Sequence, residues 1–225
     1  NWFIYYYELK TKMSVICPTV TAFEPHEYRE QIERAASFAE RIHIDLMDGE
    51  FAPTVSPDLL QIWWPHNVIA DIHLMYQRPM DHLQQIINLK PHMVIVHNEV
   101  EVHHMHFAAE LHKHDIKTGL AILKDTPIEW AEQIMHSFDQ VLIFSGNLGH
   151  HGGEADMSLL DKVKYVKKHH PEAEVAWDGG INDENARVLV AGGVDVLNVG
   201  GFVQKAENPA DAYAKLEKIV KTEEK

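Results

Sequence analysis

Short apolar runs alternate with longer amphipathic segments along almost the whole chain. Eight runs rich in Val, Ile and Leu have the composition of buried strands, at 14–20, 41–47, 68–75, 92–97, 117–123, 140–145, 173–178 and 194–200. Segments with helical periodicity lie between and after them, at 26–40, 80–89, 100–115, 158–170, 184–193 and 209–221. Repeated strand–helix units of this number predict an α/β fold, a (β/α)8 TIM barrel with a parallel sheet.

The chain of 225 residues shows no break in composition and no long linker. That length suits one barrel, so we expect a single catalytic domain over 13–225. Residues 1–12 lack amphipathic periodicity, and we expect an extension outside the core. A doubly wound open sheet is the competing architecture, but CPTVTAFEP follows the first strand where that fold has a glycine-rich dinucleotide motif.

Ionisable residues interrupt the second, third and seventh predicted strands. Side chains alternate between the two faces of a strand, so His43 and Asp45 share one face of theirs, and the opposite face is apolar. His73 and Asp178 occupy the corresponding polar faces of their own strands. In a barrel this face points inward and, at the carboxyl ends of the strands, lines the mouth. We therefore expect the four side chains to converge at one end of the barrel.

Two imidazoles and two carboxylates suit one divalent metal ion, such as Zn²⁺, Fe²⁺, Mn²⁺ or Co²⁺. The alternative is four separate buried polar residues, each hydrogen-bonded to its own neighbours. Their shared face and shared barrel end favour a metal site made by His43, Asp45, His73 and Asp178, because uncompensated buried charge is costly. Asp48 has the opposite parity and precedes Gly49, so we expect it to form a turn.

Glycine clusters follow the last three predicted strands, as GNLGHHGG at 146–153, Gly179-Gly180 and Gly200-Gly201. Glycine lets backbone N–H groups approach an anion closely, and barrels often bind phosphate in the loops after strands seven and eight. One Gly-Gly pair alone would indicate only a turn. Two pairs at adjacent strand ends, opposite a metal site, favour a phosphate site.

The formal net charge of −14 makes nucleic acid an unsuitable partner, because a phosphate backbone selects basic surfaces. Backbone dipoles can still bind a phosphate locally in an acidic protein. The lone cysteine, Cys17, excludes an internal disulfide and is compatible with a cytoplasmic location. The apolar run near the start of the chain is too short to span a membrane, so no membrane association is expected.

Five motifs in this order resemble those of ribulose-phosphate 3-epimerases: HIDLMDGEF, DIHLM, the glycine-rich loop 146–153, AWDGGIN and VGGFVQKAENP. The resemblance extends from about Pro18 to the last predicted helix. It implies a ribulose-phosphate-binding barrel, a metal-dependent isomerase that inverts C3 of a ketose phosphate. The default pair is D-ribulose 5-phosphate and D-xylulose 5-phosphate. The resemblance also implies a homo-oligomer.

The same resemblance implies a role for each residue that matches the motifs. The metal ligands would be His43, Asp45, His73 and Asp178, and Asp45 and Asp178 would also be the two acid/base groups, one on each face of the sugar. Removing the C3 proton creates a cis-enediolate that a metal stabilises, and a second acid returns a proton to the other face. Substrate and phosphate would contact Thr19, His73, Gly149, His150, His151, Gly152, Gly179, Gly180, Gly200 and Gly201. Met47 and Met75 would form an apolar floor, or simply fill the core.

The sequence departs from the family pattern around the substrate. Residues 146–156 read GNLGHHGGEAD, whereas the family has a sequence close to EPGFGGQKF. Such a loop leaves open an allulose-6-phosphate 3-epimerase or another ketohexose-phosphate epimerase. A hexulose-phosphate synthase-like lyase would need a lysine at the strand ends, which this site lacks. A non-catalytic sugar-phosphate-binding barrel would have no need to retain both aspartates.

Overall fold

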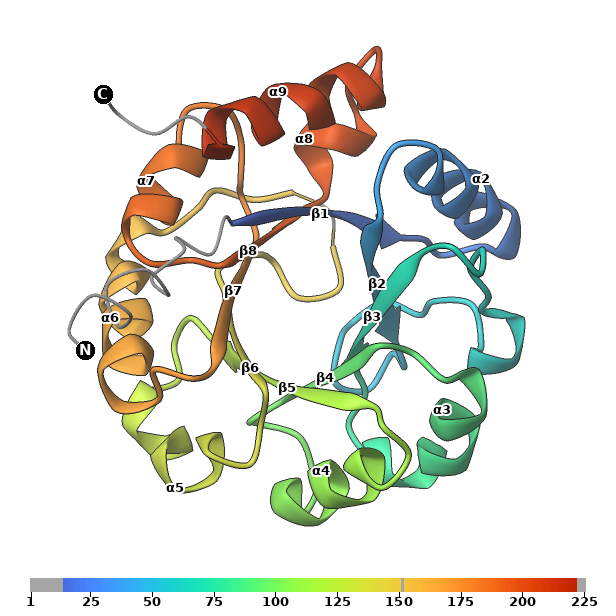
Figure 1. Cartoon of the computed structure of the whole chain (residues 1–225). Helices are drawn as coiled ribbons and strands as arrows, with labels where there is room; N and C mark the ends of the chain where they lie inside the picture. Colours follow the sequence, from blue (N-terminus) through green and yellow to red (C-terminus); the bar gives the residue numbers. More distant parts are fainter. Residues whose placement is uncertain (1–13, 151, 222–225) are drawn as a thin grey trace, which may run out of the picture.

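A computed structural model describes residues 14–150 and 152–221 of the chain. Within them, eight parallel strands close into a barrel in sequence order (Figure 1). The strands are β1 (Val15–Thr21), β2 (Arg41–Met47), β3 (Ile69–Met75), β4 (Met93–His97), β5 (Lys117–Leu123), β6 (Gln140–Phe144), β7 (Glu174–Asp178) and β8 (Val196–Val199). Each predicted strand is present with nearly the expected bounds, so the predicted TIM barrel is confirmed. The predicted extension 1–12 lies outside the described residues.

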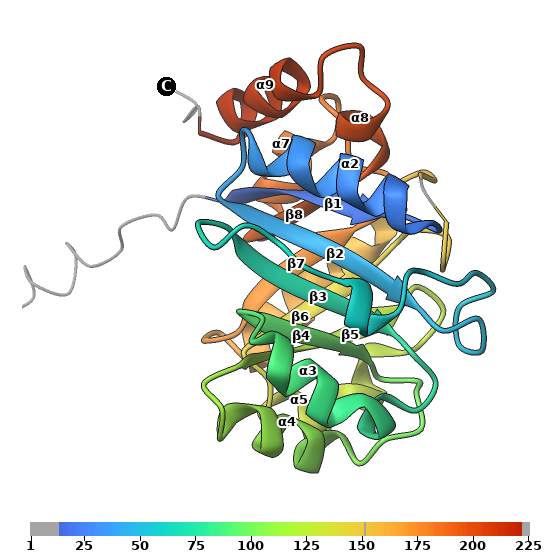
Figure 2. The ribbon, with the colours of Figure 1, turned by 90° about the vertical axis from the view of Figure 1, so that its right-hand side faces the viewer.

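Helices surround the barrel, and the long connection from β2 to β3 projects beyond the carboxyl ends of the strands (Figure 2). The α-helices are α2 (Pro25–Ala36), α3 (Leu83–Leu89), α4 (His104–His112), α5 (Glu132–Met135), α6 (Leu160–His169), α7 (Ala186–Ala191), α8 (Gly201–Gln204) and α9 (Pro209–Lys221). Four 3-10 helices are η1 (Leu59–Gln61), η2 (Pro79–His82), η3 (Ile128–Ala131) and η4 (Met157–Leu159). Among these described helices, none combines the length and apolarity needed to cross a membrane.

Two short helices escaped the sequence analysis because they span too few residues to show a period. They are α5, which continues from η3 after β5, and α8, which follows β8 directly. The predicted helices at 100–115 and 184–193 are shorter in the structure, where they are α4 and α7. Between β2 and β3 only η1 forms, in a segment that carries Pro53, Pro57 and Pro65. Proline disfavours helix in this connection.

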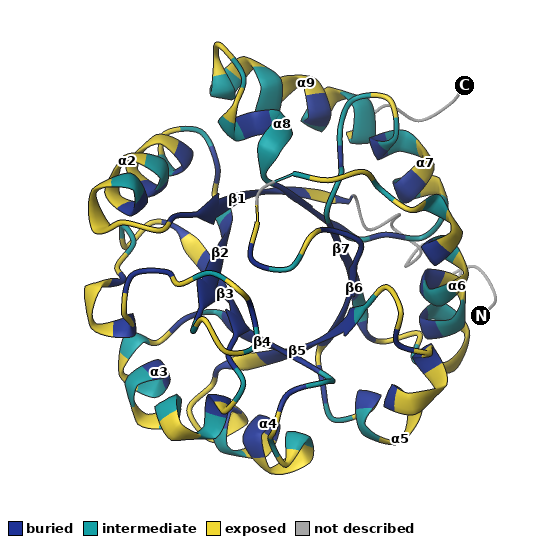
Figure 3. Cartoon of the chain, turned by 180° about the vertical axis from the view of Figure 1, so that it is seen from behind, coloured by how far each residue is buried: buried dark blue, intermediate teal, exposed yellow. Residues whose placement is uncertain are grey.

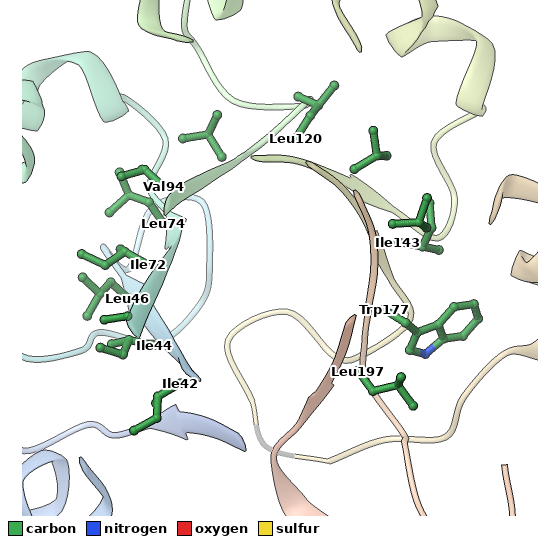
Figure 4. Close-up of a cluster of buried hydrophobic side chains, with 14 of the residues drawn as sticks. Ile42, Ile44, Leu46, Ile72, Leu74, Val94, Leu120, Ile143, Trp177 and Leu197 are labelled. Carbon is green, nitrogen blue, oxygen red and sulfur yellow. The ribbon is translucent and has the colours of Figure 1, made fainter. Parts of the chain in front are cut away.

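The apolar face of each strand packs against the helices, outside the barrel. Figure 4 shows Ile42, Ile44 and Leu46 of β2 pointing away from the barrel axis, as does Trp177 of β7. All four are fully buried, which stabilises the fold by roughly 2 kcal/mol for each aliphatic side chain. The strands are buried along most of their length, while the outer faces of the helices are exposed (Figure 3).

A second apolar cluster fills the inside of the barrel, formed by Cys17, Met93, Ile95, Ala121, Leu142, Phe144, Ala176 and Val196. Packing is tight here: a Cβ on Gly119 would lie 2.7 Å from Cγ1 of Ile95, its neighbour on the adjacent strand. The interior is therefore a packed core rather than a channel, and polar inward side chains are held at fixed positions above and below it.

Candidate active site

Four ionisable side chains meet at the carboxyl ends of the strands. His43 and Asp45 come from β2, His73 from β3 and Asp178 from the last position of β7. Asp45 pairs with His73 in the sheet register, and Asp178 reaches the same group from across the barrel. One nitrogen or oxygen from each residue lies within 4.8 Å of the others, and all four side chains are buried.

The distances within this group fit a metal ion. Nδ1 of His73 lies 3.0 Å from Oδ1 of Asp45 and 3.6 Å from Oδ2 of Asp178. Nε2 of His43 lies 3.3 Å and 3.5 Å from the same two oxygens. Ligands about 2.0 Å from a tetrahedral Zn²⁺ are separated by about 3.3 Å from one another. The four donor atoms are thus already spaced for a divalent cation.

His43 gives an independent reason to place a cation here. Its ring is fully buried, yet neither Nδ1 nor Nε2 has a hydrogen-bond partner among the described residues. Buried polar atoms are normally satisfied, so such an atom indicates a missing ligand. The donor set of two imidazoles and two carboxylates suits Zn²⁺, Fe²⁺, Mn²⁺ or Co²⁺, and the group could hold one such ion.

The two carboxylates favour the protonated form of His43. Burial lowers the pKa of His43, but the nearby carboxylates of Asp178 and Asp45 outweigh burial and raise it to about 10. Burial would raise the pKa of Asp45, but His43 and His73 hold it well below its usual range. The two carboxylates therefore create a negative potential that attracts a proton or a metal cation.

Side chains that the sequence analysis did not single out surround this group. The Thr21 hydroxyl donates to Oδ2 of Asp45 at 2.6 Å, and Nε2 of His97 lies 2.9 Å from Nε2 of His73. Asn198 is buried with no hydrogen-bond partner for either side-chain polar atom among the described residues. The parity rule could have found Thr21 and His97, because each lies an even number of positions from an inward residue of its strand.

A cavity of about 290 Å³ opens over the two aspartates. Its lining includes most of the predicted substrate residues, namely Thr19, Gly149, His150, Gly152, Gly179, Gly180, Gly200 and Gly201, together with Met75. His43 and His73 are fully buried and do not line it. Met47 also does not line it, but packs with Ala52 and Met75. His151 lies outside the described residues.

Backbone packing alone requires glycine at two of these positions, whether or not a ligand binds there. Gly179 and Gly180 have φ of +108° and +72°, in the left-handed region. A Cβ on Gly179 would collide with the backbone of Gly146, and one on Gly180 with the nitrogen of Ala155. These glycines let the β6 and β7 loops pack against each other, which closes one side of the cavity.

Lys205 is the one Lys or Arg side chain among the described residues that line this cavity. It follows α8, and its Nζ lies 3.9 Å from the position that a Cβ on Gly152 would occupy. The ammonium thus lies beside the glycine loops. Sequence patterns did not indicate it, because α8 was not predicted.

Asp48 takes the turn position expected for it. Its Oδ1 accepts hydrogen bonds from the backbone N–H of Glu50 at 2.8 Å and of Phe51 at 2.9 Å. Its Oδ2 accepts from the backbone N–H of Gln77 at 2.6 Å. Asp48 therefore anchors the β2 loop to the end of β3.

The model of the ribulose-phosphate 3 epimerase family matches residues 15–204. The chain belongs to this family. Among curated relatives, the ribulose-phosphate 3-epimerase of Bacillus subtilis is 30% identical over 73% of this chain and 80% of its own length. That of Helicobacter pylori strain 26695 is 29% identical over 91% of this chain and 97% of its own. Membership of the ribulose-phosphate 3-epimerase family makes the chain an isomerase.

Solved structures share the barrel. A 3-hexulose-6-phosphate synthase has a TM-score of 0.67 at 14% identity and covers 91% of this chain and 98% of its own. The synthase of Salmonella typhimurium has a TM-score of 0.63 at 12% identity, over 91% and 97% of the two chains. At these identities the likeness shows the fold alone, whereas the epimerase family assignment rests on the sequence matches.

Proposed function

We propose that this protein is a divalent-metal-dependent 3-epimerase that interconverts D-ribulose 5-phosphate and D-xylulose 5-phosphate. The observation that supports it most is the placement of two carboxylates, Asp45 and Asp178, on two non-adjacent strands, β2 and β7, around one buried group that could hold a metal ion. Epimerisation needs one group to remove a proton and another to return a proton to the opposite face. A carboxylate from each side of the barrel meets that requirement.

In this proposal His43, Asp45, His73 and Asp178 hold the metal ion, which supplies Lewis-acid stabilisation of the charge that develops on the substrate oxygens. One of the two aspartates takes the proton from C3, next to the C2 carbonyl, and leaves an enediolate. The other aspartate donates a proton to the opposite face of C3. The Thr21 hydroxyl binds Oδ2 of Asp45 at 2.6 Å and holds that carboxylate in one orientation.

The substrate phosphate lies, in this proposal, against the backbone N–H groups of the glycine loops. Gly149, Gly152, Gly179, Gly180, Gly200 and Gly201 all line the cavity that contains both aspartates. Lys205 supplies a positive charge on the same side, which a backbone site in an acidic protein otherwise lacks. His150 and Thr19 complete the substrate contacts, and Met75 forms an apolar wall. A homo-oligomer and a cytoplasmic location remain predictions.

Solvent exchange at C3 tests the function directly. The purified protein, freed of metal and reloaded with Zn²⁺, Fe²⁺, Mn²⁺ or Co²⁺, is incubated with ribulose 5-phosphate in D₂O and followed by NMR. We expect loss of the C3 proton signal and appearance of xylulose 5-phosphate. A ketohexose 6-phosphate in the same panel distinguishes the alternative substrate. Absence of exchange with every metal and every ketose phosphate would falsify the epimerase proposal.

A further inference from the structure

His97 and Glu99 lie behind the metal-binding group, at the end of β4 and just after it. His97 is fully buried, and its ring stacks on His73 with the centroids 4.9 Å apart and an angle of 28° between the planes. Phe51 and Phe144 enclose the same ring, with centroid distances of 4.9 Å and 5.6 Å. The ring is thus held in one place by aromatic packing, and its nitrogens have few possible partners.

One proton must lie between the two imidazoles. Nε2 of His97 and Nε2 of His73 are 2.9 Å apart, a hydrogen-bond distance. One of these nitrogens donates and the other accepts, so the tautomer of one ring determines the tautomer of the other. If His73 donates from Nε2, its Nδ1 has a lone pair that faces Asp45 and Asp178 and can bind a metal. If His73 accepts at Nε2, its Nδ1 carries the proton and cannot.

Asp45 favours the second arrangement until it binds a metal, whereas Glu99 favours the first. Oε2 of Glu99 lies 3.5 Å from Nδ1 of His97, and neither of these buried atoms forms a hydrogen bond among the described residues, so each is available to the other. A carboxylate only accepts, so it favours a proton on Nδ1 of His97. Nε2 of His97 is then the acceptor for the proton of His73. Oε1 of Glu99 accepts from the backbone N–H of Leu123 at 3.1 Å, which fixes the carboxylate.

We propose that Glu99 and His97 are positioning residues that hold His73 in the tautomer whose Nδ1 can bind a metal. Metal-binding histidines generally donate their other ring N–H to an acceptor, and the loss of that acceptor weakens metal binding. Here the acceptor is a second histidine, whose own tautomer a carboxylate sets. The inference rests on the metal site in the proposed function, but not on the epimerase reaction.

Glu99→Gln is the sharpest test because it keeps the shape of the side chain. The Leu123 N–H occupies the amide oxygen, so the amide NH₂ faces Nδ1 of His97. A donor at that place reverses both tautomers and puts a proton on Nδ1 of His73. His97→Phe removes the acceptor but retains an aromatic ring among Phe51 and Phe144. Glu101→Gln makes the same chemical change at an exposed position nearby and is the matched control.

The experiment titrates metal-free protein with Co²⁺ and follows visible absorption, while long-range ¹H–¹⁵N NMR reads the imidazole tautomers. We expect Glu99→Gln and His97→Phe to weaken Co²⁺ binding by about 10- to 100-fold, with wild-type affinity in Glu101→Gln. In the metal-free protein the NMR should show His97 protonated at Nδ1 in the wild type and at Nε2 in Glu99→Gln. Thermal unfolding identifies any variant that has lost its fold.

The outcomes separate this inference from the proposed function. If Glu99→Gln keeps both the wild-type Co²⁺ affinity and the wild-type tautomer, the inference is wrong, whatever the enzyme activity. If the variants bind Co²⁺ weakly but the metal-loaded wild type exchanges no C3 proton, the epimerase proposal is wrong and the inference stands. A wild type that binds no Co²⁺ would overturn the inference together with the metal site.

Discussion

The barrel has charged side chains at both ends, and strands β2, β3 and β7 contribute to each. At the amino-terminal end Nε of Arg41 lies 2.6 Å from Asp71, and its terminal nitrogens lie 3.2 Å and 2.9 Å from the oxygens of Glu174. Gln140 donates to Glu174 at 2.8 Å, and His92 lies 2.7 Å from Asp71. Two carboxylates from different strands thus share one permanent cation.

The carboxyl-terminal end also has two carboxylates, but no arginine or lysine of the described part of the chain forms an ion pair with them. Asp45 and Asp178 lie against the rings of His43 and His73, Asp45 also accepts from the uncharged Thr21 hydroxyl, and both nitrogens of His43 lack a hydrogen-bond partner among the described residues. The guanidinium of Arg41 neutralises the carboxylates at the amino-terminal end, whereas the carboxylates at the carboxyl-terminal end need a cation from solution. The same strands therefore provide a structural network at one end and a candidate metal site at the other.

Cavity size would have pointed to the wrong end. The cavity at the amino-terminal end measures about 1,100 Å³, compared with about 290 Å³ over Asp45 and Asp178. The carboxylates of Asp71 and Glu174 beside the larger cavity are already paired with Arg41. Buried ligand atoms without partners locate the chemistry better than volume does.

The largest expected effect comes from Asp178→Asn. The amide cannot act as an acid or base, so we expect turnover of ribulose 5-phosphate to fall at least about 1,000-fold, in the upper part of the range for such groups. The matched change on the same strand, Glu174→Gln at the other end, should leave kcat within a few fold. Coupled spectrophotometric assays measure turnover, and circular dichroism checks the fold. Substantial residual turnover in Asp178→Asn would contradict its role as an acid/base group.

Arg41→Met should reduce stability and leave activity intact, the reverse of the effect expected for Asp178→Asn. Removing the cation leaves Asp71 and Glu174 without their buried partner, so we expect the free energy of unfolding to fall by roughly 3 kcal/mol, while kcat of the folded enzyme is retained. Arg78→Met is the control, because its ion pair with Glu50 is half exposed and is expected to contribute less than about 1 kcal/mol. Urea denaturation measures both. Equal, small losses would mean that the Arg41 network is not structural.

The fold and the four candidate metal ligands could be predicted from the local sequence. Strand parity places His43, Asp45, His73 and Asp178 on inward faces, and parallel strands bring their carboxyl ends to one mouth. Each of these strands is strongly apolar on its other face. The alternation of apolar and polar residues therefore predicts each strand without knowledge of distant contacts.

The residues that contact these ligands could not be predicted, because their contacts join segments that are distant in the sequence. His97 ends an apolar run and looked like part of a buried strand, and only its 2.9 Å contact with His73 indicates a role. Lys205 follows a helix, α8, that is too short to show a period. Arg41 lies at the start of its strand, and its pairing with Glu174 joins residues 133 positions apart. No local pattern encodes such contacts.

Changing pH should affect the two ends differently. Asp178 and Asp45 overcome the effect of burial and raise the pKa of His43 from 6.5 to about 10 in the metal-free protein. Protonated His43 stabilises the metal-free fold fully below pH 6.5, and this contribution is lost as the pH rises through about 10. A metal must displace this proton, so its apparent affinity should rise roughly tenfold per pH unit between about pH 6.5 and 8.5.

Co²⁺ titration across that range measures the slope. Because the Arg41 guanidinium keeps its proton throughout, the charge that it supplies to Asp71 and Glu174 should stay constant over the same interval. The difference in unfolding free energy between wild type and Arg41→Met, measured without metal at each pH, is the control. A Co²⁺ affinity that does not change with pH would show that no protonated imidazole competes with the metal.

Lys205→Met should have the smallest effect, and Lys117→Met at the opposite mouth is its matched control. Both lysines are exposed, but Lys205 lines the cavity with the glycine loops, whereas Lys117 lines the cavity at the amino-terminal end. An exposed charge pair contributes up to about 1 kcal/mol, so we expect Lys205→Met to raise KM for ribulose 5-phosphate about fivefold with kcat little changed. Its KM should also become less sensitive to added salt, because one screened charge is gone.

Lys117→Met should leave both constants unchanged. If the two variants behave alike, the phosphate is bound by the glycine backbone without help from Lys205, and the carboxyl-terminal mouth recruits its substrate through dipoles alone.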